Sequence, residues 1–293
     1  MITMRIKGGL GNQLFQYAAG YSYAHRLNQK LQLDISFFPQ QTLRGYKLDK
    51  LMIDDSKTIS KTSKGINILK GKYLNKALRS LKVAKIPAGS KTKFLLETGS
   101  YVMDFFFQEK PENAYLDGYF QSERYFKDYR VEILRQFTPA YEPEPEYIAA
   151  RQQIQSCNSV AVHVRRGDFL KAKDDHNSNH YLLGETYYHN ALKYMKEQIE
   201  APVFFWFSDD IEWVKQNFGE ADNFRFISLK TNHGDIDEMM LMKNCRHIIA
   251  ANSTFSWWAA WLNEHEDAIK TVPAKRYGNE ELIPDGWIKI AVE

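Results

Sequence analysis

Ser159-Val160-Ala161-Val162-His163-Val164 is a continuous, mostly apolar run that ends directly before two arginines, and it decides the fold class. Similar runs follow at residues 203–207, 224–228 and 247–251, separated by helical stretches. Continuous apolar runs indicate strands that are buried on both faces, and strands that alternate with helices indicate a parallel sheet. We therefore predict a Rossmann-like α/β domain in the second half of the chain.

The N-terminal half opens with the same strand, turn and helix pattern. Apolar residues alternate from Ile2 to Ile6, glycines interrupt the pattern, and apolar residues then recur at helical spacing up to Tyr21. We predict a second α/β domain here, so that two Rossmann-like domains face a cleft.

A segment rich in proline and glutamate, residues 139–146, marks the expected boundary between the domains. We predict an N-terminal domain over residues 1–145 and a C-terminal domain over residues 146–293. Residues 54–93 are rich in Lys and Ser and only weakly periodic. We expect short helices on a solvated surface there, and no chemistry.

Composition argues against several classes of protein. The formal charge of +3 comes from 39 basic and 36 acidic residues, too small an imbalance to indicate a nucleic-acid partner. No apolar run approaches the roughly 18 residues of a membrane span, and the N-terminus does not look like a signal peptide. Cys157 and Cys245 are expected to be reduced thiols. We expect a cytoplasmic protein without a transmembrane segment, and no amphipathic basic helix stands out.

The strongest site signal is the pair Arg165 and Arg166 at the end of the first of these strands. In open α/β sheets ligands bind at the carboxyl ends of strands. Guanidinium groups match the oxygens of a diphosphate, and their fixed charge would stabilise a departing nucleoside diphosphate. The alternative is a surface basic pair that bonds neighbouring carboxylates.

A second anion site is suggested by Asn252, Ser253, Thr254 and Phe255, where a strand ends and a helix begins. The amides and dipole at a helix N-terminus can hold a phosphate. The alternative is that Ser253 only caps its helix while Phe255 joins a core stripe.

The glycine turn between residues 8 and 13 is the third candidate. It resembles a nucleotide-binding loop in composition, but its glycine spacing matches neither the Walker nor the dinucleotide pattern. Gly9 and Gly11 would let a ligand approach the backbone, and Asn12 and Gln13 could bond sugar hydroxyls or phosphate. The alternative is a packing turn that Asn12 caps.

Asp235-Ile236-Asp237 has the Asp-x-Asp form with which many sugar-nucleotide transferases bind a divalent metal. The segment begins a helical stretch, where carboxylates are favoured by the helix dipole in any case. We therefore favour capping or nucleoside contact over metal. His176 and His180 complete no zinc spacing, and we predict no metal or other cofactor.

Four segments together resemble the α-1,2-fucosyltransferases, the glycosyltransferase family 11 enzymes that include bacterial and blood-group H members. They come in the family's order and cover nearly the whole chain; they are residues 8–17, 116–123, 163–168 and 252–258. The resemblance implies a GT-B fold, GDP-β-L-fucose as donor, inversion to an α-fucoside, the 2-hydroxyl of a galactoside as acceptor, and no metal requirement.

The resemblance also implies roles for individual residues. Arg165 and Arg166 match the donor-binding motif and would hold the diphosphate, with His163 and Asp168 as supporting or catalytic groups. The related protein O-fucosyltransferases suggest further donor contacts, which are Asn12 near the reacting centre, Asp237 at the nucleoside, and Ser253, Thr254 and Phe255 at the phosphates.

Without the membrane anchor of animal members, the chain looks like a bacterial enzyme of capsule, lipopolysaccharide or oligosaccharide synthesis. Its acceptor is then a galactose-containing oligosaccharide or a lipid-linked glycan, and the latter would leave room for a peripheral position at the inner membrane. Acceptor contacts are expected in the N-terminal half, where Tyr46, Asp104, Phe105 and Phe106 are candidates. The alternatives are a fucosyltransferase of α-1,6 or protein O-linkage, a metal-dependent transferase, and a non-catalytic carbohydrate-binding protein.

Overall fold

The structure, a computed structural model, describes residues 1–40, 45–54, 57–89, 91–99, 102–167, 182–274 and 280–292. The chain forms two compact units, Met1–Tyr141 and Glu142–Glu293. The second unit takes in the residues just before position 145, because the Glu144 carboxylate accepts hydrogen bonds from the backbone and side-chain amides of Asn232. Pro145 then starts a helix, a position that suits its fixed φ.

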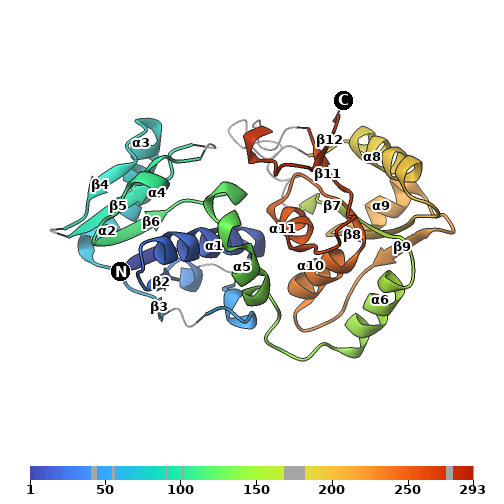
Figure 1. The fold of residues 1–293 in the computed structure, drawn as a ribbon, viewed down its shortest axis with the longest axis horizontal. Coiled ribbons are helices and arrows are strands. Elements are labelled where there is room, and N and C mark those ends of the chain that lie inside the picture. Colours follow the sequence, from blue (N-terminus) through green and yellow to red (C-terminus); the bar gives the residue numbers. More distant parts are fainter. Residues whose placement is uncertain are drawn as a thin grey trace. The chain divides into compact units, whose positions relative to one another are not determined.

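Within the described residues, the N-terminal unit has a six-stranded sheet of order β3-β2-β1-β6-β5-β4 (Figure 1). All its pairs are parallel except β4 with β5. The strands are β1 (Ile2–Arg5), β2 (Leu31–Asp34), β3 (Lys57–Ile59), β4 (Lys85–Pro87), β5 (Thr92–Leu96) and β6 (Asn113–Asp117). The α-helices are α1 (Leu10–Arg26), α2 (Lys64–Lys70), α3 (Lys72–Ser80), α4 (Phe105–Gln108) and α5 (Arg130–Gln136).

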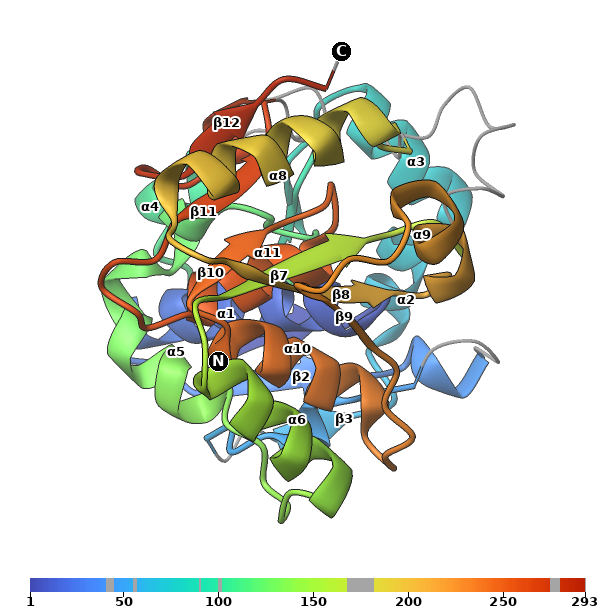
Figure 2. The same cartoon turned by 90° about the vertical axis from the view of Figure 1, so that its right-hand side faces the viewer.

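The C-terminal unit has a second six-stranded sheet in its described part, of order β12-β11-β10-β7-β8-β9 and parallel throughout. Helices α8 and α9 lie on one side of it and α10 and α11 on the other (Figures 1 and 2). The strands are β7 (Ser159–Val164), β8 (Val203–Ser208), β9 (Phe224–Ile227), β10 (His247–Ile249), β11 (Lys270–Pro273) and β12 (Ile288–Ile290). The α-helices are α6 (Pro145–Gln155), α8 (Glu185–Gln198), α9 (Ile211–Phe218), α10 (Gly234–Asn244) and α11 (Thr254–Leu262).

Both sheets have a topological switch point, which is the pair of adjacent strands from which the chain connections lead outward in opposite directions. In the C-terminal sheet it lies between β7 and β10, and in the N-terminal sheet between β1 and β6. Ligands of open α/β sheets bind at the carboxyl ends of the strands beside such a point. The prediction of two Rossmann-like α/β domains is confirmed, and each unit has one place where a ligand is expected.

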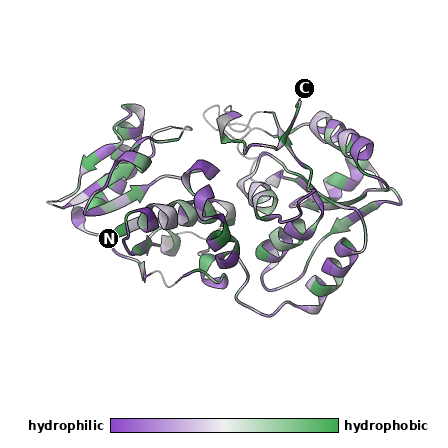
Figure 3. Cartoon of the chain, viewed as in Figure 1, coloured by the Kyte–Doolittle hydropathy of each residue, from purple (hydrophilic) through white to green (hydrophobic). Residues whose placement is uncertain are grey.

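Strand β7 shows how the apolar runs build the core. Val160, Val162 and Val164 are buried in the cluster beneath α8 and α9. Successive residues of a strand point to opposite faces, so Ala161 and His163 point to the other side. Hydropathy colouring shows hydrophobic stretches on the strands and on parts of the helices (Figure 3).

The segment over residues 54–93 differs from its prediction. It contains β3, α2, α3, β4 and the start of β5, so it contributes three strands to the sheet besides the expected short helices. These strands are short and contain lysines, and β3 and β4 are edge strands. They therefore lack the continuous apolar run from which a buried strand is predicted. None of the described helices is long and apolar enough to cross a membrane.

Candidate functional site

The two arginines after β7 lie at the switch point of the C-terminal sheet. Arg165 Nη1 is 3.0 Å from Asp209 Oδ2, and Arg166 Nε is 3.3 Å from Asp210 Oδ2. Both aspartates follow β8, the parallel neighbour of β7. The Arg166 guanidinium also lies 3.7 Å from the centre of the Trp213 ring, a cation–π contact. The ion pairs of the alternative interpretation are therefore present, and they fix both guanidiniums at the sheet edge.

Asp209 also fixes the backbone that follows the arginines. Its carboxylate oxygens accept hydrogen bonds from the amides of Arg166 (2.9 Å) and Gly167 (3.0 Å). A Cβ at position 167 would lie 2.7 Å from Asp209 Oδ2, so this contact requires glycine there. Asp168, like His176 and His180, lies outside the described residues.

Buried polar groups with no hydrogen-bond partner lie beside the arginines. His163 is 4% exposed and Asn252, at the end of the adjacent strand β10, is 3% exposed. Within the described part of the chain, His163 Nδ1 and both polar atoms of the Asn252 side chain have no partner. An unpaired buried polar group costs about 1–3 kcal/mol. Two such groups at a switch point indicate a site that a polar ligand completes.

The protonation of His163 follows from its burial. Burial, with a smaller contribution from the charge of Arg165, lowers the pKa of His163 to about 3. Its imidazole is therefore neutral at pH 7. It can exchange hydrogen bonds with a ligand there, but it is too weak a base to take a proton readily.

Helix α11 begins at the same place. The Ser253 hydroxyl accepts a hydrogen bond from the Phe255 amide (3.3 Å), so the capping interpretation of Ser253 is confirmed. Thr254 is the first helical residue. The Phe255 ring centre lies 5.4 Å from that of His163, which places the start of α11 next to the buried histidine.

The acidic residues of α10 have different surroundings. Asp237 is buried and accepts a hydrogen bond from the Thr231 hydroxyl (2.5 Å). Glu238 did not stand out in the sequence, yet burial and repulsion from Asp235 and Asp209 raise its pKa to about 7. Among the residues that the structure describes, no group of His, Cys, Asp or Glu side chains is placed to hold a metal.

In the N-terminal unit the glycine turn starts α1. Gly8 has φ +83°, and a Cβ there would lie 2.9 Å from Asn12 Nδ2. Gln13 is fully buried, donates to the carbonyls of Gly8 and Gly45, and accepts from the Lys47 amide (3.0, 2.9 and 2.9 Å). Gln13 therefore holds the backbone of Gly45 and Lys47 against the glycine turn. Gly9 is the N-terminal cap residue of α1 and Gly11 is buried within its first turn.

A strained turn follows β6 on the other side of this switch point. Phe120 has φ +52°, which is unfavourable for a residue with a side chain, and it is fully buried. The buried Glu97 carboxylate holds the turn by accepting hydrogen bonds from the amides of Tyr119 (2.6 Å) and Phe120 (3.0 Å). A Cβ at Gly118 would lie 2.5 Å from Glu97 Cβ, so the carboxylate fits only against glycine.

The turn presents groups suited to a sugar. Tyr119 remains 40% exposed, and Lys7 Nζ lies 4.9 Å from its ring centre. The Gln121 amide donates to Asn12 Oδ1 (2.9 Å), which joins the turn to the start of α1. An exposed aromatic ring beside amide side chains is typical of surfaces that bind pyranose rings.

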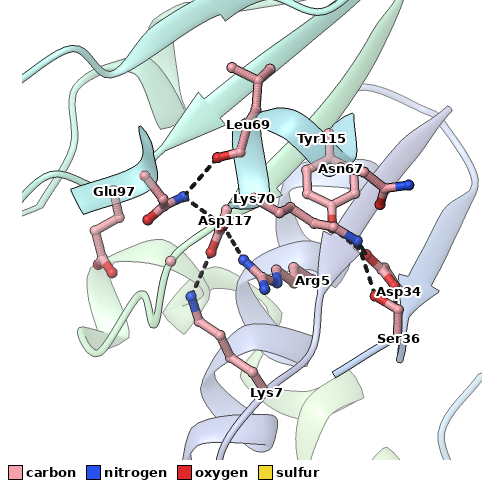
Figure 4. Close-up of polar contacts among 12 residues, drawn as sticks. Arg5, Lys7, Asp34, Ser36, Asn67, Leu69, Lys70, Glu97, Tyr115 and Asp117 are labelled. Atoms are coloured by element: carbon pink, nitrogen blue, oxygen red, sulfur yellow. Dashed lines mark hydrogen bonds and ion pairs between the residues drawn. The ribbon is translucent and has the colours of Figure 1, made fainter. Parts of the chain in front are cut away.

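Beneath this turn lies a buried ionic cluster (Figure 4). Asp117, at the end of β6, is fully buried and pairs with Lys7 (2.6 Å) and Arg5 (2.7 Å). Asp34, at the end of β2, pairs with Lys70 (2.8 Å). These contacts hold the carboxyl ends of the central strands in place.

Two of the acceptor candidates from the sequence are core residues. Phe105 and Phe106 are buried, and Phe106 packs against Phe120 and Tyr125, so the prediction that these phenylalanines contact an acceptor is wrong. Their apolar run marks core rather than surface. Asp104 is exposed, and Tyr46 is half-buried.

Comparison with known proteins places this architecture among glycosyltransferases. The profile of glycosyl transferase family 11 matches residues 1–291. The chain is 35% identical to an alpha-1,2-colitosyltransferase of Escherichia coli, over 99% of both chains. It is 32% identical to the O-antigen biosynthesis glycosyltransferase WbnK of Escherichia coli, over 97% of this chain and 99% of that one. It is 23% identical to a galactoside 2-alpha-L-fucosyltransferase of Caenorhabditis elegans, over 100% of this chain and 79% of that one.

A solved structure resembles the fold. A mutant of Arabidopsis thaliana FUT1 in complex with GDP superposes with a TM-score of 0.52 at 12% identity, over 92% of this chain and 69% of that one. At this identity the likeness concerns the fold alone, and it agrees with the predicted GT-B type.

Proposed function

The chain belongs to glycosyl transferase family 11, and on that premise we propose that it transfers L-fucose from GDP-β-L-fucose to the 2-hydroxyl of a β-galactoside. The product is an α-1,2-fucoside of a glycan such as an O-antigen or capsule precursor. One observation carries the donor side of this proposal. Two fixed guanidiniums stand beside the buried His163 Nδ1 and Asn252 side-chain amide, which have no hydrogen-bond partner among the described residues, at the switch point of a Rossmann-like sheet.

These residues suit the departure of GDP. The acceptor oxygen attacks the anomeric carbon, the bond from that carbon to the β-phosphate oxygen breaks, and negative charge grows on the phosphate. Arg165 and Arg166 stabilise that charge, and Ser253, Thr254 and Phe255 supply the helix N-terminus beside it. The low pKa of His163 favours hydrogen bonding to the donor over proton abstraction. Asp168 stays a predicted supporting or catalytic group, and Asp237 the predicted nucleoside contact.

The N-terminal switch point suits the acceptor. Tyr119 would cover the apolar face of the galactose ring, and Asn12 with Gln121 would bond its hydroxyls. Gly9, Gly11 and Gln13 shape this turn, which favours an indirect role for them in binding. Glu97 acts through the turn that it holds.

The test is GDP release from GDP-fucose, with and without lactose or Galβ1-3GalNAc, in excess EDTA, followed by linkage analysis. We expect acceptor-dependent release and an α-1,2-fucoside. An α-1,6-linked or peptide-linked product would contradict the proposed α-1,2 linkage. Loss of activity in EDTA would contradict a metal-independent mechanism. GDP binding without transfer to any acceptor would refute catalysis.

A second donor has specific support in the 35% identity to an alpha-1,2-colitosyltransferase over 99% of both chains. Colitose is a deoxy relative of fucose, so both donors present the same GDP to the arginines. Parallel assays with GDP-fucose and GDP-colitose decide between them, because the native donor should show the higher kcat/KM.

The acceptor surface leads to a prediction for Tyr119→Ala. We expect the KM for the galactoside to rise about tenfold through loss of ring stacking, with the KM for GDP-fucose unchanged. Tyr119→Phe should keep the wild-type KM. Tyr73→Ala removes another exposed tyrosine of the same unit and is the matched control. An unchanged galactoside KM in Tyr119→Ala would exclude stacking.

A further inference from the structure

Charge is distributed unevenly along the chain. Residues 56–96 contain no Asp or Glu but eleven Lys and Arg residues, at positions 57, 61, 64, 70, 72, 76, 79, 82, 85, 91 and 93. The rest of the chain has 28 basic and 36 acidic residues, a net charge of −8, so the whole-chain charge of +3 conceals a segment of +11. Such a segment would attract an anionic partner.

The segment also concentrates exposed apolar side chains. Of eleven large apolar residues that are exposed in the described structure, five lie between Ile68 and Val83. Tyr73 is 86% exposed and Leu81 is 74% exposed. An apolar group clustered on a surface marks an interaction site.

Helix α3 attaches to the sheet through polar groups rather than apolar ones. Asn75 donates to Asp117 (3.1 Å), and Arg79 pairs with the same carboxylate (3.6 Å) and donates to the Glu97 carbonyl. Leu78 alone packs on the small core beneath, and no residue of α3 is fully buried. The inward face is thus largely polar, which leaves apolar residues on the outer face.

The outer face of α3 combines both features. Tyr73 lies in the first turn of α3 and Leu81 is its C-cap residue, eight positions further on, with Ala77 between them at helical spacing. Lys72, Lys76 and Lys82 are exposed beside it. Within the described residues these lysines form no ion pair, whereas Lys70, Lys85, Lys91 and Lys93 are paired.

We propose that the outer face of α3 with the turn at its C-terminal end, formed by Lys72, Tyr73, Lys76, Leu81 and Lys82, binds the surface of an anionic lipid bilayer. Lysines meet the negative headgroups while Tyr73 and Leu81 enter the interface. The phosphates of a nucleic acid would complement the lysines, but a nucleic acid would give Leu81 no apolar surface to contact. A second copy of the chain would bring lysines against lysines. The bilayer is the partner that matches both components.

The surface lies close to the proposed acceptor turn within the same unit. Asp117 contacts Asn75 and Arg79 of α3 and also Lys7, whose ammonium lies over Tyr119. A bilayer bound by α3 would therefore lie near the place where a lipid-linked glycan is used. The surface itself does not depend on the proposed function and is tested without turnover.

Flotation with phosphatidylcholine vesicles that do or do not contain phosphatidylglycerol tests the proposal on the full chain. We expect binding only to the anionic vesicles, weakened by salt. Each lysine near such a surface contributes about fivefold to partition, so replacing Lys72, Lys76 and Lys82 with Gln should weaken it roughly 100-fold. Tyr73→Ser with Leu81→Ser should weaken it by roughly tenfold or more.

Matched controls separate this face from general charge and hydrophobicity. Lys30, Lys110 and Lys127 are exposed lysines of the same unit, without ion pairs in the described structure, and their replacement by Gln should leave partition unchanged. Val131→Ser, at a 78% exposed site, is the apolar control. The proposal is overturned if wild type ignores anionic vesicles, if target and control variants bind alike, or if sedimentation shows that this face joins two copies.

Discussion

Arg165→Ala is expected to lower kcat/KM for fucosyl transfer by roughly 10²- to 10³-fold. The side chain supplies a fixed positive charge where the diphosphate develops negative charge, and loss of one such group in a preorganised site costs about this much. Arg165→Lys keeps the charge but loses the planar guanidinium, so its activity should fall between that of Arg165→Ala and wild type. Steady-state kinetics with GDP-fucose and lactose measure all three proteins.

Folding should be little affected by this change. Arg165 is partly exposed, and Asp209 keeps its hydrogen bonds from the Arg166 and Gly167 amides. Loss of a partly exposed ion pair costs about 1 kcal/mol or less. Arg151→Ala, at an exposed arginine of α6, is the control for both stability and activity. Wild-type turnover in Arg165→Ala, with GDP affinity intact, would remove the arginine from the mechanism.

The central strands could be predicted because their signal is local. The continuous apolar run 159–164 is fully buried, and strand β7 begins and ends at the residues that the run predicts. Strands β3 and β4 are short edge strands with exposed lysines, and β11 and β12 are also short. Their place in the sheet depends on neighbours that lie far away in sequence, so local patterns could not reveal them.

The candidate site divides in the same way. Arg165 and Asn252 could be named because each directly follows an apolar run, which is readable from the sequence. Asp209 as the partner of Arg165 and Glu97 as the clamp of a strained turn required the fold, because these contacts join separate segments. The whole-chain net charge also conceals the basic segment at 56–96, because acidic residues elsewhere cancel its charge. Only a residue-by-residue count reveals it.

Asp117→Asn is expected to destabilise the N-terminal unit by about 3–5 kcal/mol. The carboxylate is fully buried among the partly buried Lys7, Arg5 and Arg79, and its removal would leave these cations without their counter-charge. All six tryptophans lie after residue 200, in the C-terminal unit. Urea unfolding should therefore shift to lower urea by circular dichroism, with a smaller shift by tryptophan fluorescence.

The pH dependence of stability provides an independent check on the same carboxylate. Burial opposes ionisation of Asp117, but the surrounding cations outweigh it and hold its pKa well below the usual range. Its stabilising contribution is thus present above the carboxyl's unfolded-state pKa and is lost as the pH falls toward the folded-state value. In wild type the unfolding free energy of the N-terminal unit should decrease steeply in acid, and Asp117→Asn should flatten this decrease. Asp128→Asn, at an exposed site, should keep the wild-type profile. If Asp117→Asn matched that control in both urea and acid, the cations around position 117 would have to be solvated rather than buried.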